Sequence, residues 1–288
     1  MNDDAYDELS FMQLKKYIKE STGFNCDQYK DAHFRRRIKV RMRLTNSNNY
    51  SEYIHVLEEE RTEQKNLIDT LTINVTDFFR NHETFRIIEE EILPTLIKSR
   101  SSSLFKTIRI WSAGCAAGEE AYSIAILLHK LLKNDVGKYR INIIGTDLDV
   151  ISLKKARKGI YNEIEMRNVD KKTRECYFQK MGDSYQVIDE LKDLIHFKQH
   201  DMLSGPKISY FDMIICRNVM IYFKKEIQEQ LYLDFYQALN NGGFFIIGKS
   251  ETMTGPAAGY FTPYNTRERL YVKKIPGNKH DKTNQRVK

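Results

Sequence analysis

The residues best suited to chemistry are acidic side chains beside a glycine-containing loop. The loop, residues 113–118, starts at Ala113 and has glycines in a G-x-x-x-G spacing, and Glu119 and Glu120 open the helix expected after it. A helix N-terminus attracts phosphate, but two carboxylates there would repel it and favour a cation. S-adenosylmethionine carries a sulfonium and an ammonium group, so it fits better than a nicotinamide dinucleotide. The alternative is a purely geometric glycine turn, followed by acids that complement the helix dipole.

Two further acids follow expected strands. Asp147 ends the second strand, where a carboxylate can accept both ribose hydroxyls of an adenosine. Asp201 follows the third strand and could reach an adenine amino group. In the simpler reading, Asp147 or Asp149 only caps the next helix, and Asp201 only caps a turn.

These loops require a sheet whose strands end at one edge. From about residue 104 short apolar runs alternate with helical stretches, which predicts a parallel, doubly wound α/β sheet that binds ligands beyond the carboxyl ends of its strands. The expected strands are 108–111, 141–145, 195–198, 211–216, 244–247 and 270–272, and the expected helices are 119–132, 150–157 and 225–239.

The rest of the chain departs from this alternation. Apolar residues recur at helical spacing through the first 75 or so residues, so we expect a small all-α N-terminal domain at 1–78, ahead of a catalytic domain at 79–275. Two alternating runs around Gly182 and Asp183 predict a hairpin within a β-insert at about 160–194. Residues 276–288 are expected to form a disordered basic tail.

Composition limits the protein class. The 288 residues carry a net charge of +7, but the positive charge is concentrated in 28–44 and 271–288, which disfavours a polyanion-binding stripe along the whole fold. No apolar run is long enough to span a bilayer, and we expect no secretory signal. Four cysteines without a Cys-x-x-Cys pair favour a reducing cytoplasm. His196, His200 and Asp201 lack a further ligand at useful spacing, so no metal site is expected.

Three longer motifs indicate a family. They are Asn74-Val75-Thr76-Asp77-Phe78-Phe79-Arg80, the stretch from Trp111 to Ser123, and Cys216-Arg217-Asn218-Val219-Met220-Ile221-Tyr222-Phe223. With them the chain closely resembles the chemotaxis receptor methyltransferases (CheR family) over nearly its whole length. The resemblance implies a Rossmann-like S-adenosylmethionine-dependent methyltransferase fold with a small all-α N-terminal domain and an inserted β-subdomain.

The resemblance also implies an activity and partners. The family transfers a methyl group to glutamate side chains of chemoreceptor signalling helices, which gives γ-methyl esters and S-adenosylhomocysteine. We therefore expect a cytoplasmic monomer that associates with membrane-bound receptor arrays, without membrane insertion or nucleic acid. Relatives differ in whether the β-insert captures a receptor C-terminal peptide. The short hairpin here favours independence from such a tether.

Carried over by position, the family motifs name the site residues. Arg80 and Tyr222 are expected near the transferring methyl group. The expected cofactor contacts are Asn74, Thr76, Arg80, Ala113, Gly114, Glu119, Asp147, Asp201, Met202, Arg217 and Asn218. Relatives often have asparagine in place of Asp201. We expect Arg80 to clamp the carboxylate of the cofactor and Tyr222 to orient the incoming glutamate. Alternatively, Arg80 forms a structural salt bridge and the Tyr222 ring packs under the sheet edge.

One basic helix is a candidate docking surface. At 100° per residue, Arg35, Arg36, Lys39 and Arg43 fall within one arc of roughly 100°, next to an apolar stripe that can anchor the helix. Because receptor methylation segments are glutamate-rich, we expect this arc to bind the substrate. The alternatives are a nucleic-acid methyltransferase and a non-catalytic, cofactor-sensing adaptor. The first usually has an Asn/Asp-Pro-Pro-aromatic motif where this chain has Cys216-Arg217-Asn218-Val219.

Overall fold

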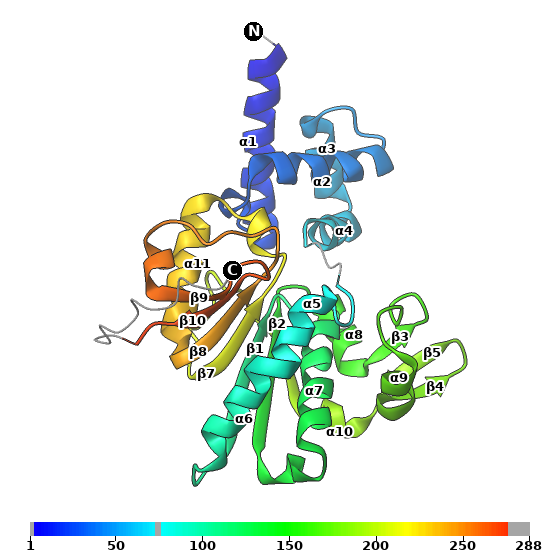
Figure 1. The fold of residues 1–288 in the computed structure, drawn as a ribbon. Coiled ribbons are helices and arrows are strands. Elements are labelled where there is room, and N and C mark those ends of the chain that lie inside the picture. The colour runs from blue at the N-terminus through cyan, green and yellow to red at the C-terminus, as the bar shows by residue number, and fades with distance from the viewer. Residues whose placement is uncertain (1–2, 73–75, 276–288) are drawn as a thin grey trace. The chain divides into compact units, whose positions relative to one another are not determined.

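The computed structural model describes residues 3–72 and 76–275, and these divide into two compact units (Figure 1). The first comprises Met1–Ile73 together with Tyr222–Gln228, and the second comprises Asn74–Ile221 and Glu229–Lys288. Asn74 and the expected tail at 276–288 lie outside the described residues. The domain limits expected at residues 78 and 79 stay a prediction.

The first unit is helical, as expected. Its elements are α1 (Asp3–Thr22), the 3-10 turn η1 (Cys26–Gln28), α2 (Asp31–Leu44), α3 (Tyr50–Glu59) and α4 (Arg61–Leu71). The apolar stripe of α2 is buried at Phe34, Ile38 and Met42. Asn49 is the N-cap that precedes α3, and its side chain accepts a hydrogen bond from the backbone N–H of Glu52.

The second unit contains a seven-stranded sheet in the order β6-β2-β1-β7-β8-β10-β9. Its strands are β1 (Thr107–Ala113), β2 (Arg140–Asp147), β6 (Ile195–Gln199), β7 (Phe211–Cys216), β8 (Leu239–Ile247), β9 (Phe261–Asn265) and β10 (Leu270–Lys273). The first five run parallel, whereas β10 is antiparallel to both β8 and β9. The sheet is therefore mixed rather than wholly parallel, and β9 is a strand that the apolar pattern did not predict.

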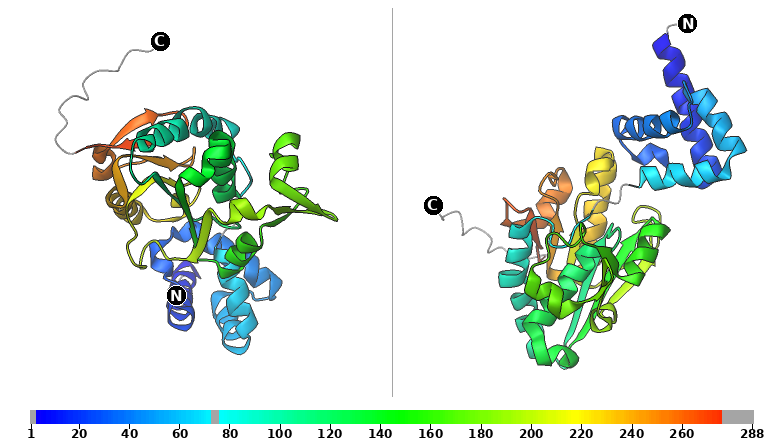
Figure 2. Two further views of the ribbon diagram at one scale, coloured as in Figure 1. Left: turned by 90° about the horizontal axis from the view of Figure 1, so that it is seen from below. Right: turned by 90° about the vertical axis from the view of Figure 1, so that its right-hand side faces the viewer.

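Helices cover both faces of this sheet, as the contacts of successive side chains along β8 show. Phe244 and Ile246 lie in the core that includes α7 (Glu119–Leu132), α5 (His82–Ile87) and α6 (Leu93–Ser101). The intervening Phe245 stacks against Phe235 of α11 (Lys225–Ala238), with ring centroids 5.2 Å apart. Since successive side chains of a strand point to opposite faces, α11 covers the face opposite α7 (Figure 2). The doubly wound prediction is confirmed.

The remaining elements of the second unit are short. A three-stranded sheet, β3-β5-β4, contains β3 (Ile160–Asn162), β4 (Phe178–Met181) and β5 (Ser184–Val187), so the predicted hairpin around Gly182 is confirmed. The other elements are η2 (Ile88–Ile92), η3 (Lys133–Lys138), α8 (Val150–Lys158), α9 (Lys171–Tyr177), α10 (Asp189–Lys192), η4 (Met220–Tyr222) and η5 (Pro256–Tyr260). Among the described residues, no helix combines the length and the apolarity that a bilayer crossing requires.

Candidate active site

The glycine loop is a tight turn that only small residues can form. Gly114 has φ +73°, and a Cβ there would lie 2.6 Å from the Cγ2 of Val219. Gly118 has φ +93°, and its Cβ would meet Phe197 and Ala156 at 2.9 Å. Both positions therefore need glycine, the first because another loop packs directly against it.

Asp147 joins the end of β2 to this loop. One carboxylate oxygen accepts the Ala116 N–H at 2.8 Å, and the other accepts the Asp149 N–H at 2.9 Å. The side chain of Asp149, rather than Asp147, caps α8, since it accepts the Ile151 N–H at 2.8 Å. Burial raises the pKa of Asp147, and the backbone donors oppose that rise. The carboxylate that we expected to bind ribose is thus buried beside the glycine loop and is not the helix cap.

Glu119 and Glu120 start α7 but have different surroundings. Glu120 accepts the Ser112 hydroxyl at 2.8 Å and pairs with Arg217 at 3.5 Å. Glu119 is only 2% exposed, and within the described residues its Oε2 has no hydrogen-bond partner. Burial raises the pKa of Glu119 to about 8. A buried carboxylate oxygen without a donor is costly, so a ligand that supplies a donor would stabilise Glu119.

Arg80 interacts electrostatically with Glu120. Burial raises the pKa of the Glu120 carboxyl, and the positive charges of Arg217 and Arg80 oppose that rise because they favour the ionised form. Arg217 donates to the backbone oxygen of Arg80 at 2.8 Å and to the side-chain oxygen of Asn81 at 2.5 Å. Phe79 and Asn81 both have positive φ, which costs energy in non-glycine residues. Arg217 is therefore occupied in holding the segment that carries Arg80.

The remaining expected cofactor contacts have different surroundings. Asp201 caps a turn, because its carboxylate accepts the Leu203 N–H at 2.9 Å and the Ser204 hydroxyl at 2.5 Å. Met202 and Thr76 are half-buried. Asn218 has φ +61°, and its Oδ1 is buried without a partner in the described part of the chain. The adenine contact expected of Asp201 and Met202 remains a prediction.

Tyr222 belongs to the helical unit. Its backbone oxygen accepts the Lys30 N–H at 2.9 Å, and its ring meets the His33 ring edge-on, with centroids 5.3 Å apart. The next residue, Phe223, forms a β-bridge with Tyr29. Within the helical unit, Tyr222 and Phe223 are thus held by α2 and the turn before it.

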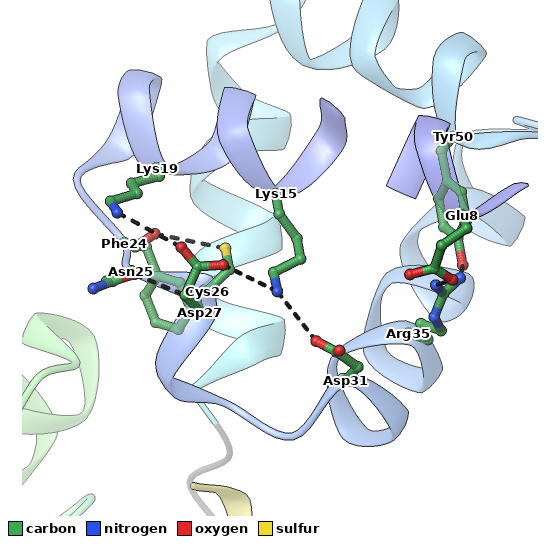
Figure 3. Close-up of polar contacts among 10 residues, drawn as sticks. All are labelled: Glu8, Lys15, Lys19, Phe24, Asn25, Cys26, Asp27, Asp31, Arg35 and Tyr50. Atoms are coloured by element: carbon green, nitrogen blue, oxygen red, sulfur yellow. Dashed lines mark hydrogen bonds and ion pairs between the residues drawn. The ribbon is translucent and has the colours of Figure 1, made fainter. Parts of the chain in front are cut away.

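The four residues of the basic arc on α2 differ in their contacts, and their docking role stays a prediction. Arg35 pairs with Glu8 (Figure 3). It also pairs with Asp7 at 3.2 Å, and its guanidinium lies 3.6 Å from the ring centroid of Phe11. The helical unit therefore already engages Arg35. Its proposed partners in docking, Arg36, Lys39 and Arg43, are exposed.

Two structural features were not predicted from the sequence. Glu251, which follows β8, accepts the Met220 N–H at 2.8 Å. Its position past the carboxyl end of a parallel strand was the available signal. A cavity of about 560 Å³ lies at the β6 edge, lined by Tyr122, Arg157, Lys192, Ile195, His196, Phe197 and Lys198. It contains none of the expected site residues, so cavity volume does not mark this site.

Comparison with known proteins agrees with the geometry. Residues 74–269 match the CheR methyltransferase SAM binding domain, and residues 9–72 match the CheR methyltransferase all-alpha domain. The chemotaxis protein methyltransferase of Listeria innocua is 33% identical over 87% of this chain and 92% of its own length. That of Borreliella burgdorferi is 34% identical over 86% of this chain and 89% of its own.

A third relative matches almost end to end. Chemotaxis protein methyltransferase 2 of Vibrio cholerae is 30% identical over 99% of this chain and 100% of its own length. The two family models together cover most of the helical unit and every strand of the seven-stranded sheet except β10. The chain therefore belongs to the CheR family of S-adenosylmethionine-dependent methyltransferases.

Proposed function

We propose that this protein methylates glutamate side chains of chemoreceptors to γ-glutamyl methyl esters during sensory adaptation in chemotaxis, and forms S-adenosylhomocysteine. Membership of the CheR family supports the reaction class. The single observation that carries the assignment to this site is Glu119, a buried carboxylate with an unpartnered oxygen beside the glycine loop. Such a group needs a donor or a cation, and the methyl carrier supplies both.

The residues present fit that cofactor. Two buried carboxylates at the start of α7 disfavour a phosphate and suit a positively charged ligand. Asp147 and Glu119 would hold its ribose and its cationic part, with Asn74, Thr76, Ala113, Gly114, Asp201, Met202 and Asn218 lining the remaining contacts. The cofactor supplies an electrophilic methyl group on its sulfonium, and no metal is part of this proposal.

The chemistry needs no general base. A glutamate has a reference pKa of about 4.3, so the substrate carboxylate is already ionised at pH 7. Carboxylate and sulfonium become an ester and a thioether, so charge is lost along the reaction path. A site that excludes water favours such a step, and in-line positioning can contribute roughly 7–11 kcal/mol.

Arg80 and Tyr222 are proposed to position rather than to transfer protons. If Arg80 gripped the substrate carboxylate, it would stabilise the reactant more than the transition state. A bidentate pair with the carboxylate of the cofactor avoids that cost. The half-buried Arg80, whose backbone is fixed by Arg217, suits this clamp. Tyr222 is proposed to orient the incoming glutamate.

Receptor docking is assigned to the exposed part of the α2 arc. Arg36, Lys39 and Arg43 present positive charge to an acidic methylation helix, while Arg35 is used mainly within the helical unit. We propose that docking takes place at cytoplasmic arrays of membrane-bound receptors. The β-insert has a two-residue turn between β4 and β5, which supports action without a receptor peptide tether.

A labelled-methyl assay tests the proposal. Protein, labelled S-adenosylmethionine and receptor-containing membranes are incubated, with RNA as a parallel acceptor. We expect label on the receptor that alkali releases as methanol, as a methyl ester requires. Label on RNA would support a nucleic-acid methyltransferase, and no label on either acceptor would support an adaptor.

A further inference from the structure

The carboxylate of Glu251, in the loop after β8, is buried against the turn that follows β7. Glu251 is 3% exposed and closes a turn after β8, in which its N–H donates to the Gly248 oxygen at 2.9 Å. Its Oε1 accepts the Met220 N–H at 2.8 Å, and its Oε2 accepts the Gly248 N–H. Glu251 thus joins the ends of β7 and β8.

The backbone around this carboxylate is shaped to receive it. The N–H groups of Gly248, Asn218, Met220 and Val219 all stabilise the ionised form and oppose the rise in pKa that burial causes. Asn218 has positive φ, and successive N–H groups in such a turn form a nest for an anion. A Cβ on Gly248 would lie 2.8 Å from Oε2 of Glu251 and 2.9 Å from N of Asn218, so no side chain fits there.

The turn that Glu251 holds contacts both halves of the candidate cofactor site. Val219 packs against Gly114 of the glycine loop, as the 2.6 Å approach of its Cγ2 to a Cβ built there shows. Arg217 reaches the backbone of Arg80 at 2.8 Å. A shift of this turn would therefore move the wall of the glycine loop and the anchor of Arg80 together.

We propose that Glu251 is a positioning residue for methyl transfer, which holds the 217–220 turn so that Val219 and Arg217 fix Gly114 and Arg80. This inference rests on the site assigned above. Glutamine has nearly the same shape, but one of its two terminal atoms is a donor. In Glu251→Gln an NH₂ group would therefore face a backbone N–H that needs an acceptor.

Asp212 of β7, the strand that precedes the 217–220 turn, provides a matched control. It is also buried and also accepts a backbone N–H, that of Arg109 at 2.9 Å, but it lies at the other end of β7. Both Glu251→Gln and Asp212→Asn replace a buried carboxylate by its amide. Only the first should disturb the cofactor site.

The test measures binding and turnover in the full-length protein. Calorimetric titration with S-adenosylhomocysteine should show at least tenfold weaker binding for Glu251→Gln and less than twofold change for Asp212→Asn. In the receptor assay, Glu251→Gln should raise the KM for S-adenosylmethionine and lower kcat, with the KM for receptor unchanged. A misplacement of about 1 Å can reduce rate by roughly a hundredfold.

Two results would overturn the inference: wild-type affinity and kcat in Glu251→Gln, or an equal loss in Asp212→Asn. If Glu251→Gln does not fold, as judged by circular dichroism, Gly248→Ala replaces it. The added methyl group displaces the carboxylate, so the same loss of binding is expected, and unchanged binding would reject the proposal. Because binding is measured without receptor, a protein that binds the cofactor but does not methylate receptors would contradict the proposed function alone.

Discussion

The two ends of β7 both hold buried charge but use it differently. At the amino end, Asp212 accepts the Arg109 N–H at 2.9 Å and the Asn240 amide at 2.9 Å and pairs with Arg100, so neither of its oxygens lacks a partner. At the carboxyl end, within the described residues, Glu119 Oε2 and Asn218 Oδ1 are buried without one. Both oxygens of the carboxylate at the first end are used within the fold, whereas we propose that the polar atoms at the second end bind the ligand.

The comparison supports our placing the candidate site at the carboxyl end. Parallel strands bring their loops together at one edge, and β1, β2, β7 and β8 all have polar side chains at or just past their carboxyl ends there. The carboxylates of Asp147, Glu120 and Glu251 fix the loops, and Glu119 remains available. Buried polar groups that lack partners are the exception in folded proteins, and both Glu119 and Asn218 follow strands at this edge of the sheet.

The largest expected effect is at Arg80. Arg80→Ala should weaken S-adenosylhomocysteine binding roughly 30-fold to 100-fold, because a charge-assisted pair contributes about 2–3 kcal/mol. Receptor binding, measured by pull-down with receptor membranes, should stay unchanged. Calorimetric affinity equal to that of the wild type would identify Arg80 as a structural residue.

A substitution at the amino end of β7 should change the stability of the fold and leave cofactor binding unchanged. Asp212→Ala leaves Arg100 and the Arg109 N–H without their acceptor, so we expect a loss of about 3 kcal/mol in the free energy of unfolding. Urea denaturation measures it. The folded variant should bind S-adenosylhomocysteine as the wild type does, and a tenfold weaker affinity would contradict the separation of the two ends.

At the carboxyl ends of the strands, the contribution of Glu119 to stability should depend on pH. The folded protein raises the pKa of Glu119 to about 8, whereas in the unfolded chain it lies near 4.3. A raised acid pKa means that this group stabilises the fold at low pH and that the contribution is lost as pH rises through about 8.

A ligand that needs ionised Glu119 must therefore release a proton on binding below pH 8. Calorimetry in buffers of different ionisation enthalpy should detect it, and S-adenosylhomocysteine affinity should fall by up to about tenfold per pH unit below 8. Glu119→Gln should abolish this dependence. Its persistence in the variant would assign the proton to another group.

The docking surface should show a smaller, salt-dependent effect. Arg36→Glu with Arg43→Glu should raise the KM for receptor several-fold at low ionic strength, because opposite charges steer association, and less so in high salt. Exposed Lys171 and Lys172 on α9 serve as a matched charge-reversal control. An unaltered KM in the α2 double variant would reject docking on this arc.

The smallest effect is expected for Tyr222→Phe. The ring and its packing on His33 remain, and only the hydroxyl is lost. We expect a loss of a few-fold in kcat, since one neutral hydrogen bond contributes about 1 kcal/mol. Single-turnover methylation measures this loss, and a rate equal to that of the wild type would show that the Tyr222 hydroxyl has no role in methyl transfer.

Local pattern predicted the elements that depend on local forces. Helix α7 starts after Gly118 and ends at Leu132 as expected, because a left-handed glycine and an apolar stripe define it. Strand β9 was missed because Pro263 interrupts a short run of mixed polarity, and its pairing with β10 is a tertiary property. Strand propensity is overridden by such tertiary pairing.

The sequence also could not predict which polar side chains have hydrogen-bond or ion-pair partners. Arg35 and Arg36 are neighbours in one basic run, yet only packing against α1 shows that Asp7 and Glu8 engage the first. Glu251 lies 31 residues from the N–H that it accepts. Motifs identified the family and named the candidate site residues, but the partners of each charge required the fold.

A crystal structure with bound S-adenosylhomocysteine tests the central idea most directly. We predict the ligand at the carboxyl ends of β1 and β2, with a donor within hydrogen-bond distance of Glu119 Oε2 and its ribose on Asp147. A ligand bound elsewhere, with that oxygen still lacking a donor, would contradict the account.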